Sequence, residues 1–225
     1  HIAFGKRWGT LNIHPYVKGM ADHPEILEII KEPSERINFG GGWHSDMSFL
    51  EVPALGSILH AIEVPDVGGD TLFASQYAAW EALSPGLKQT LEGLRAIHSA
   101  AEEYGAGGAS SKKRASMDSE VVGDDVPEYE HPVVRTHPET RRKSLYLNPN
   151  RMEQIVGLDR AESDRLLDEL IAHATQPKYQ YRHVWRRGDI VIWDNRCTMH
   201  KANADYPDGE RRLMHRVIVA GTQPF

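Results

Sequence analysis

The stretch "IVIWDNRCTMHKANADYPDGERRLMHRVIVAG" (residues 190–221) consists of an apolar run, a polar middle segment and a second apolar run. Both apolar runs are rich in β-branched residues and have the period-2 alternation that is typical of strands. The polar segment carries His200, and the second run contains Arg212 and Arg216. Because these two arginines are four residues apart, they point to the same face of a strand. Two guanidinium groups in one cavity repel each other unless anions lie beside them, so the stretch predicts a sheet that binds anionic ligands.

Similar alternating runs recur along the chain and predict further strands. They are "SILHAI" (57–62), "SLYLN" (144–148), "YQYRHVW" (179–185), "DIVIWDN" (189–195) and "RVIVAG" (216–221). The "RRGD" tetrapeptide between the third and the fourth of these runs is typical of a tight turn. It predicts that the strands on either side of the turn are antiparallel neighbours.

Two stretches carry the start signals of helices. Ser84 is a good N-cap residue, and Pro85 then occupies the first helical position. Asp159 precedes Glu162 by three residues, which is the spacing of a capping box, and an apolar stripe follows. The predicted helices are scattered among the strands and do not alternate strictly with them. The sequence therefore predicts the α+β class, with a sandwich or barrel of mostly antiparallel strands flanked by helices.

Length and composition limit the classes of protein that fit. The chain has 225 residues, of which 40% are hydrophobic and 26% charged, so we expect one globular domain over residues 1–225. The net charge of −6 argues against a nucleic-acid partner, and no apolar run is long enough to cross a membrane. A single cysteine, Cys197, fits a reducing compartment, so we expect a cytoplasmic protein. Since the chain does not begin with Met, we also expect that its natural N-terminal segment is missing.

Residues 102–130 interrupt the strand pattern. This segment is rich in Gly, Ser and charged residues and poor in apolar ones. A long segment of this kind inside a compact domain is either a functional lid or a disordered insertion. Because it connects two parts of one sheet-rich domain, we predict a mobile lid loop rather than an interdomain linker.

The stretch "GGWHSDMSF" (residues 41–49) places His44 and Asp46 one residue apart. On a strand these two side chains point to the same face and can bind one metal ion. His200, from the stretch quoted first, would complete a facial set of two histidines and one carboxylate, as in non-heme Fe(II) oxygenases. The same tripeptide pattern also arises by chance as a hydrogen-bonded polar pair. A zinc hydrolase is a second reading of the three ligands, and a non-catalytic binding protein is a third.

Four motifs in order along the chain identify a family. They are "WHSDMSF" (43–49), "PDVGGDTLFAS" (65–75), "HPVVRTHPET" (131–140) and "WDNRCTMHKANADYPDGERRLMHR" (193–216). The chain resembles the TauD/TfdA family of Fe(II)- and 2-oxoglutarate-dependent dioxygenases, named after taurine dioxygenase and 2,4-dichlorophenoxyacetate dioxygenase. The resemblance runs through nearly the whole chain. It implies a double-stranded β-helix core, also described as jelly-roll or cupin-like.

The resemblance assigns roles to positions of this sequence. His44, Asp46 and His200 match the metal ligands, and Thr71 and Arg212 match the residues that hold the distal carboxylate of 2-oxoglutarate. The residues leave two alternatives open. Thr71 also suits a helix cap or the "GGDT" turn, and the register of the neighbouring arginines leaves Arg211 as a rival to Arg212.

Four further positions match the substrate pocket of the taurine enzyme. Arg216 matches the residue that binds the anionic head of the substrate, with His14 and the backbone N–H of Met47 assisting it. His14 also suits an ordinary strand end. Arg151 stands where the taurine enzyme has an aromatic residue, so it adds positive charge to the pocket or else points to solvent or to a neighbouring subunit.

The resemblance implies an oxygenase that uses Fe(II), 2-oxoglutarate and O2 and releases succinate and CO2. The substrate is a small anionic organic molecule, such as a sulfonate, a sulfate ester, an aryloxyalkanoate or a related acid. The carboxylate of Asp46 favours hydroxylation over halogenation, because related halogenases lack it. We expect no nucleic-acid or membrane partner, and a homo-oligomer that is a dimer or a tetramer.

Overall fold

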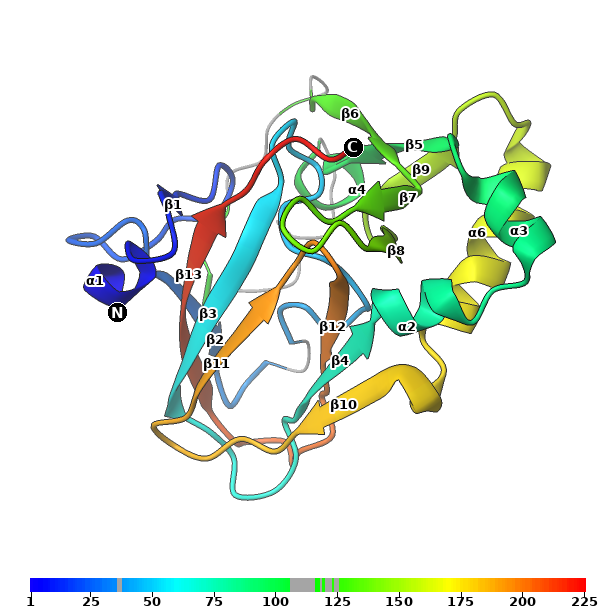
Figure 1. Cartoon of the computed structure of the whole chain (residues 1–225). Helices are drawn as coiled ribbons and strands as arrows, with labels where there is room; N and C mark the ends of the chain where they lie inside the picture. The colour runs from blue at the N-terminus through cyan, green and yellow to red at the C-terminus, as the bar shows by residue number, and fades with distance from the viewer. Residues whose placement is uncertain (36–37, 106–115, 118, 120–122, 124–125) are drawn as a thin grey trace.

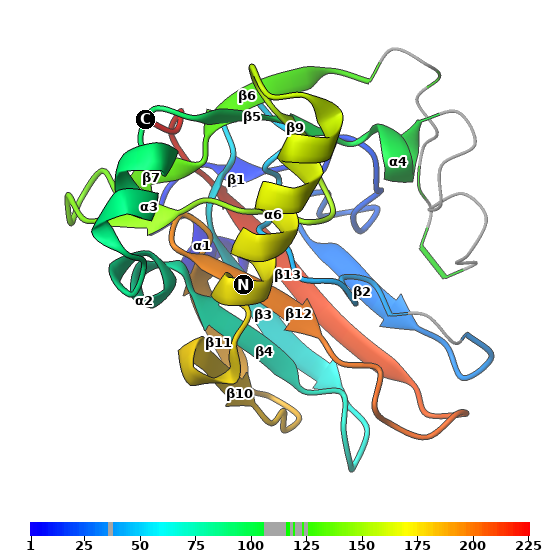
Figure 2. The same ribbon diagram turned by 90° about the vertical axis from the view of Figure 1, so that its right-hand side faces the viewer.

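The computed structural model describes residues 1–35, 38–105, 116, 117, 119, 123 and 126–225, and its strands far outnumber its helices (Figures 1 and 2). Every strand pair in it is antiparallel. The prediction of a mostly antiparallel core with flanking helices is therefore confirmed.

The largest sheet has the strand order β1-β13-β3-β11, and β2 also pairs with β13. Its strands are β1 (Leu11–Asn12), β2 (Leu27–Lys31), β3 (Ala54–Glu63), β11 (Ile190–Asp194) and β13 (Arg212–Ala220). The predicted strands at 57–62, 189–195 and 216–221 lie in this sheet, although β3 and β13 extend further than expected.

A second sheet has the order β10-β4-β12, with β4 (Thr71–Ser75), β10 (Gln180–His183) and β12 (Thr198–Ala202). The remaining strands form two smaller sheets. One has the order β6-β5-β9, with β5 (Arg95–Ser99), β6 (Glu128–Pro132) and β9 (Met152–Ile155). The other is the pair of β7 (Val134–Thr136) and β8 (Lys143–Leu145). Figure 1 shows β12, β4 and β10 beside the large sheet.

The helices are α1 (Ile2–Gly5), α2 (Gln76–Glu81), α3 (Pro85–Leu91), α4 (Ala101–Tyr104), α6 (Arg160–Ala174) and the 3-10 turn η1 (Pro177–Tyr179). Both predicted caps are present. The Ser84 hydroxyl accepts a hydrogen bond from the N–H of Leu87, and the Asp159 carboxylate accepts one from the N–H of Glu162. In Figure 2, α6 lies along the side of the molecule where α2 and α3 also gather.

The prediction that the "RRGD" turn joins neighbouring strands is wrong. The turn forms, because the N–H of Asp189 donates to the carbonyl of Arg186, but β10 pairs with β4 while β11 pairs with β3. Before the turn, the indole of Trp185 donates to Thr71 on the second sheet. After it, Gly188 and Asp189 exchange backbone hydrogen bonds with Ala61 on the large sheet. The turn therefore carries the chain from one sheet to the other.

The core has two main parts. One lies between the large sheet and the second sheet and includes Leu59 and Met214 from the first and Phe73 from the second. The other lies beneath α6 and includes Leu167 and Leu170. The first part is the one that surrounds the predicted metal ligands, because the ring of Phe73 contacts the ring of His200, with 6.1 Å between centroids.

Most of the predicted lid over residues 102–130 lies outside the described residues, so the lid stays a prediction. Its described flanks are the end of α4 and the start of β6. Among the described helices, none combines the length and the apolar character needed to cross a membrane.

Candidate active site

The fold brings His44, Asp46 and His200 together. The potential ligand atoms of the three side chains all lie within 4.8 Å of one another. Backbone pairing fixes this arrangement, since the N–H of His44 donates to the carbonyl of His200 at 3.0 Å and the N–H of His200 donates to the carbonyl of His44 at 2.8 Å. The two imidazole rings consequently lie with 4.1 Å between their centroids.

The imidazoles have the protonation that a metal ligand needs. Nδ1 of His44 is 2.8 Å from the carbonyl oxygen of Gly42, and because that oxygen only accepts, Nδ1 carries the proton. The lone pair of Nε2 then faces Asp46 at 3.7 Å, and Nε2 of His200 lies 3.9 Å from the other carboxylate oxygen. Burial lowers the pKa of both histidines, so both stay neutral, which is the form that binds metals.

Asp46 is held in place and kept ionised. Burial alone would raise the pKa of this carboxyl, but the Arg216 guanidinium and then the two imidazoles hold it below its usual range. Nη1 of Arg216 donates to Oδ1 at 2.8 Å, and the hydroxyl of Ser57 donates to Oδ2 at 2.6 Å. The amide oxygen of Asn195 accepts from the backbone N–H of Asp46. Each carboxylate oxygen keeps a lone pair for a cation, because a carboxylate oxygen carries two.

This donor set fits a divalent transition metal. Two neutral imidazole nitrogens and one carboxylate oxygen on one side of an ion leave its other positions open, as in the facial arrangement of non-heme iron sites. A cavity of about 40 Å³ lies directly beside His44 and Asp46. Its lining consists of His14, Phe39, Gly40, His44, Ser45, Asp46, Met47, Phe49, Glu103, Tyr104, Arg151 and Arg216.

A second group of potential ligands, His137, Asp194 and Cys197, does not form such a site. The carboxylate of Asp194 already accepts hydrogen bonds from Nε2 of His137 and from the guanidinium of Arg196. Burial, followed by the charge of Asp194, raises the pKa of Cys197 to about 11, so its thiol stays protonated and binds metals poorly.

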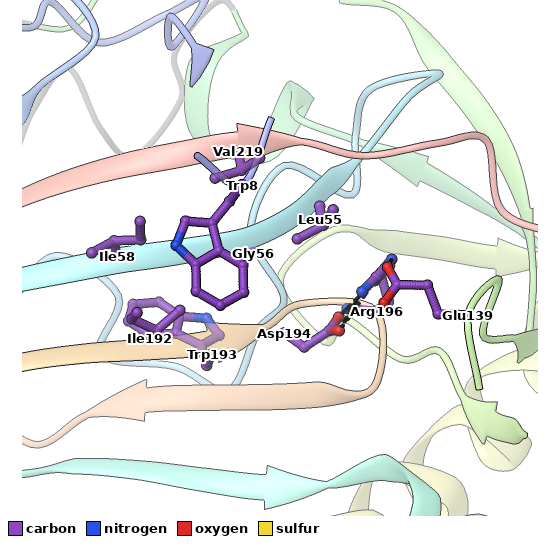
Figure 3. A pocket seen from close by; sticks show the side chains of 10 residues that line it. All are labelled: Trp8, Leu55, Gly56, Ile58, Glu139, Ile192, Trp193, Asp194, Arg196 and Val219. Atoms are coloured by element: carbon purple, nitrogen blue, oxygen red, sulfur yellow. Dashed lines mark hydrogen bonds and ion pairs between the residues drawn. The ribbon is translucent and has the colours of Figure 1, made fainter. Parts of the chain in front are cut away.

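Figure 3 shows the apolar groove next to this group, on the large sheet. Trp8, Ile58 and Trp193 lie at one end of it, and the charged residues gather at the other. There Arg196 lies between Asp194 and Glu139 and binds both, with 2.8 Å between its Nη1 and Glu139. The charged groups of the groove are thus engaged with one another, and the groove lacks the donor set found beside His44.

His14 lines the active-site cavity as a neutral hydrogen-bond donor. Its Nδ1 accepts from the backbone N–H groups of Tyr16 and Val17, both at 3.1 Å, so the ring proton must sit on Nε2. Burial, and then the nearby charge of Arg216, lowers the pKa of His14 to about 3. The structure has His14 beside the cavity, two residues beyond the end of β1.

Met47 has a left-handed backbone, with φ of 59°. A non-glycine residue pays for this conformation, so its surroundings must enforce it. The side-chain amide of Asn148 donates to the carbonyl of Ser45 and to the hydroxyl of Ser48, and thereby holds the chain on both sides of Met47. The hydrogen bonds of Asn148 therefore hold the loop that carries Asp46 in one conformation.

Arg151 lies at the cavity rather than in solvent. Its guanidinium forms an ion pair with Glu103 on α4 and stacks on the rings of Phe49 and Tyr104, at 5.3 and 5.5 Å from their centroids. The sequence did not identify Glu103 as its partner. The positive charge that we expected in the pocket is thus present, but it is paired with the carboxylate of Glu103.

Thr71 and Arg212 are the first residues of β4 and β13, and both strands run upward from the lower end of the molecule in Figure 1. Both residues are buried. Burial lowers the pKa of Arg212 to about 10. The rival residue, Arg211, points outward and pairs with Glu32 and Glu63, so the inward residue of this strand is Arg212.

Thr71 does not cap the next helix. Ser75 does so, since its hydroxyl accepts from the N–H of Ala78. The hydroxyl of Thr71 instead accepts from the indole of Trp185 at 2.9 Å, which leaves its own proton for a second partner.

The sequence reasoning missed Ser57 and Asn195, which position Asp46. Ser57 is completely buried within the apolar strand β3, and Nδ2 of Asn195 donates to its hydroxyl at 2.9 Å. A polar residue at an inward position of a predicted strand was the signal that could have identified Ser57.

Comparisons with known proteins identify the family of the chain. The profile of the family described as "Taurine catabolism dioxygenase TauD, TfdA family" matches residues 1–218. The (S)-phenoxypropionate/alpha-ketoglutarate-dioxygenase of Sphingobium herbicidovorans is 37% identical to this chain over 98% of it and 77% of the relative. A putative alpha-ketoglutarate-dependent sulfonate dioxygenase of Schizosaccharomyces pombe is 40% identical over 81% of this chain, which spans only 45% of that longer relative.

Solved structures give the same result. The crystal structure of a putative alpha-ketoglutarate-dependent taurine dioxygenase from Burkholderia xenovorans has a TM-score of 0.82 and 32% identity, and the match covers all of this chain and 74% of that one. The crystal structure of AAD-2 in complex with Mn(II) and N-oxalylglycine has a TM-score of 0.75 and 33% identity, and it covers 99% and 77% of the two chains. The chain therefore belongs to the TauD/TfdA family of dioxygenases.

Proposed function

We propose that this protein is an Fe(II)- and 2-oxoglutarate-dependent dioxygenase that hydroxylates a small organic anion and releases succinate and CO2. The observation that carries the proposal is the buried set of His44, Asp46 and His200 beside a cavity that also contains Arg216. When bound there, Fe(II) with 2-oxoglutarate and O2 supplies the oxidising chemistry. The relatives named above are dioxygenases, and none of their names supports a zinc hydrolase or a non-catalytic binding protein.

The three ligand residues would present the metal with one negative charge. His44 and His200 contribute neutral Nε2 atoms, and Asp46 contributes the carboxylate. Ser57 and Arg216 hold the two oxygens of this carboxylate in place, so the ligand set needs little rearrangement when a cation binds.

Arg212 and Thr71 would bind the distal carboxylate of 2-oxoglutarate. Arg212 is a buried guanidinium whose Nε lacks a hydrogen-bond partner among the described residues, which is costly unless an anion binds there. Thr71 is the first residue of β4, which pairs with β12. In that pair Phe73 is the partner of His200, and Thr71 lies two positions before Phe73. This places Thr71 on the same inward face of β4 as the ring that packs on His200.

The substrate would bind through its anionic group. Arg216, the Nε2–H of His14 and the backbone N–H of Met47 are the donors proposed for that group, and all three residues line the cavity. Arg151 would face the rest of the substrate together with the aromatic rings of Phe49 and Tyr104. A sulfonate, a sulfate ester, an aryloxyalkanoate or a related acid combines an anionic head with an apolar body and suits this lining.

Several broader features are part of the same proposal. The large sheet and the β10-β4-β12 sheet, with a shared core between them, would form a double-stranded β-helix. Residues 1–225 would be a single oxygenase domain with a lid over 102–130, acting as a cytoplasmic homo-oligomer without nucleic-acid or membrane partners. The net charge of −6 supports the absence of a nucleic-acid partner.

The test is O2 uptake and succinate release by the purified protein with Fe(II) and 2-oxoglutarate. The substrate panel should contain sulfonates, sulfate esters, aryloxyalkanoates and amino-acid-like acids. We expect turnover that requires both Fe(II) and 2-oxoglutarate and that rises with at least one panel member. Turnover that persists without 2-oxoglutarate, or hydrolysis of a sulfate ester without O2, would contradict the proposal.

A further inference from the structure

Lys31 occupies an inward position of the large sheet. In β2, Leu27, Ile29 and Lys31 are buried, whereas Glu28 and Ile30 between them are partly exposed. A lysine at the end of this inward series is unusual, because lysine is almost never fully buried without a partner. Lys31 is only 6% exposed.

Lys31 lies directly opposite Arg212. The two residues are register partners in the antiparallel pair of β2 and β13. Directly opposed residues of an antiparallel pair project to the same face, with Cβ atoms about 5 Å apart. The ammonium of Lys31 and the guanidinium of Arg212, which is 5% exposed, therefore enter the same part of the interior.

The polar side chains that face outward on these strands and beside their ends have partners. Arg211 binds Glu32 and Glu63, and His215 lies 3.4 Å from Glu28. On the inward face the situation differs. In the part of the chain that the structure describes, neither Lys31 nor Arg212 has a carboxylate within ion-pairing distance, and Nε of Arg212 lacks a hydrogen-bond partner.

Tyr206 is the group that the structure places beside both cations. Nζ of Lys31 lies 4.7 Å from the centroid of the Tyr206 ring. The same tyrosine is close enough to Arg212 to raise its pKa, in opposition to the larger effect of burial. The hydroxyl of Tyr206 donates to the side-chain oxygen of Asn38 at 2.6 Å, so the ring is fixed. A cation over a neutral ring gains much less than burial costs two neighbouring positive charges.

We propose that Lys31 is a second cationic residue of the 2-oxoglutarate site and that it binds the distal carboxylate of 2-oxoglutarate together with Arg212. This inference rests on the proposed function, because it assigns a further residue to the co-substrate of that reaction. It accounts for two buried cations on one face, since a carboxylate between them would neutralise their mutual repulsion. It also explains why Lys31 is inward while Glu28, the acidic residue of the same strand, is partly exposed.

The experiment compares Lys31→Met, Lys31→Arg and the parent protein, with Lys88→Met as a matched control. Lys88 also lies over an aromatic ring, with Nζ 5.6 Å from the centroid of Trp80, but it is on the partly exposed helix α3. Two quantities are measured on the Fe(II)-loaded protein without O2: the Kd of 2-oxoglutarate and the Kd of 2-oxopentanoate, which lacks the distal carboxylate. The melting temperature is measured without any keto acid.

For Lys31→Met we expect a Kd of 2-oxoglutarate that is about 10- to 100-fold weaker, the usual size of a lost charge-assisted hydrogen bond. The Kd of 2-oxopentanoate should not change, and Lys31→Arg should restore most of the 2-oxoglutarate affinity. The melting temperature of Lys31→Met without keto acid should rise, because an uncompensated buried charge has been removed. Lys88→Met should leave both dissociation constants unchanged.

Three results would overturn the inference. An unchanged Kd of 2-oxoglutarate in Lys31→Met would do so while leaving the proposed function intact. Equal weakening of both keto acids together with a lower melting temperature would show that Lys31 only supports the packing of Tyr206. Failure of the parent protein itself to bind 2-oxoglutarate would instead overturn the proposed function, and the inference with it.

Discussion

Arg216 and Asp46 form a buried ion pair, with 2.8 Å between Nη1 and Oδ1 and with side chains only 3% and 5% exposed. The residue proposed to bind the substrate thus also holds a proposed metal ligand. Substrate binding and metal binding should therefore be linked through this contact. Removing one partner of a buried ion pair leaves the other charge uncompensated, which usually costs several kcal/mol.

Arg216→Met should raise the KM for the substrate by at least about 100-fold and should also weaken Fe(II) binding, because Asp46 loses the guanidinium that orients it. KM from O2 uptake and the Kd of the metal measure the two effects. Arg211→Met is the matched control, since Arg211 immediately precedes the same strand and faces outward. Its KM and metal Kd should change less than about threefold. An effect on KM alone would contradict the link.

His44→Ala and His200→Ala should each remove the bound metal and lower turnover by more than about 1,000-fold, because two ligands hold the ion far less firmly than three. Metal content after gel filtration and succinate release are the measurements. His137→Ala provides the control, because it removes a member of the second His/Asp/Cys group. If His137→Ala loses the metal and His44→Ala retains it, the metal site has been assigned to the wrong group.

Ser57→Ala should weaken Fe(II) binding by about 10-fold, since hydrogen-bond partners of metal ligands commonly contribute 10- to 100-fold to metal affinity. The hydroxyl of Ser57 is 2.6 Å from Oδ2 of Asp46. Ser144→Ala is a suitable control, because Ser144 is equally buried but donates to the carbonyl of Arg196 away from the cavity. Metal affinity measured by titration should distinguish the two variants. Equal losses would indicate a general effect on stability.

Glu103→Gln should change which substrates bind, because it removes the carboxylate that accompanies Arg151. We expect the KM of substrates with a second anionic group to fall several-fold relative to monoanions of similar size, since the guanidinium becomes available to them. Arg151→Met should abolish that preference in the Glu103→Gln background. The measurement is the ratio of kcat/KM for paired mono- and dianionic substrates. An unchanged ratio would mean that Arg151 does not contact the substrate.

Cys197 should react slowly with alkylating reagents at neutral pH. Its pKa is raised to about 11, chiefly by burial, so the reactive thiolate is a minor species below that pH. The rate of iodoacetamide labelling of the native protein should rise about tenfold per pH unit as the pH approaches that value. Mass spectrometry of samples labelled between pH 7 and 10 measures this rate. Fast labelling at pH 7 would show that the thiol lies in a more polar environment.

The parts of this site that were predictable from the sequence depend on local spacing. The four-residue separation of Arg212 and Arg216 specifies a shared face of β13, as expected. The assumption that His44 and Asp46 lie on a strand is wrong, because His44 forms an isolated bridge with His200 and Asp46 lies in the turn that follows. The capped helices starting after Ser84 and Asp159 were predictable for the same reason, since a cap acts within one helical turn.

The remaining features depend on partners that are distant in sequence. The "RRGD" turn gives no indication that Trp185 and Gly188 attach to different sheets, because hydrogen bonds to Thr71 and Ala61 decide that. Lys31 resembles an ordinary strand-end lysine until its register with Arg212 is known. Likewise, the contact of Arg151 with Glu103 arises from two segments that only tertiary packing brings together.

The reciprocal backbone hydrogen bonds between His44 and His200 have a consequence for maturation. They join residues that are distant in sequence by peptide groups alone, so folding by itself brings the two imidazoles together. Metal uptake would then be a late capture step that adds little order to the chain, in contrast to a zinc finger, which folds only around its ion. Such a protein should become competent to acquire its metal once it has folded, and which ion it first contains would depend on the metals available to it.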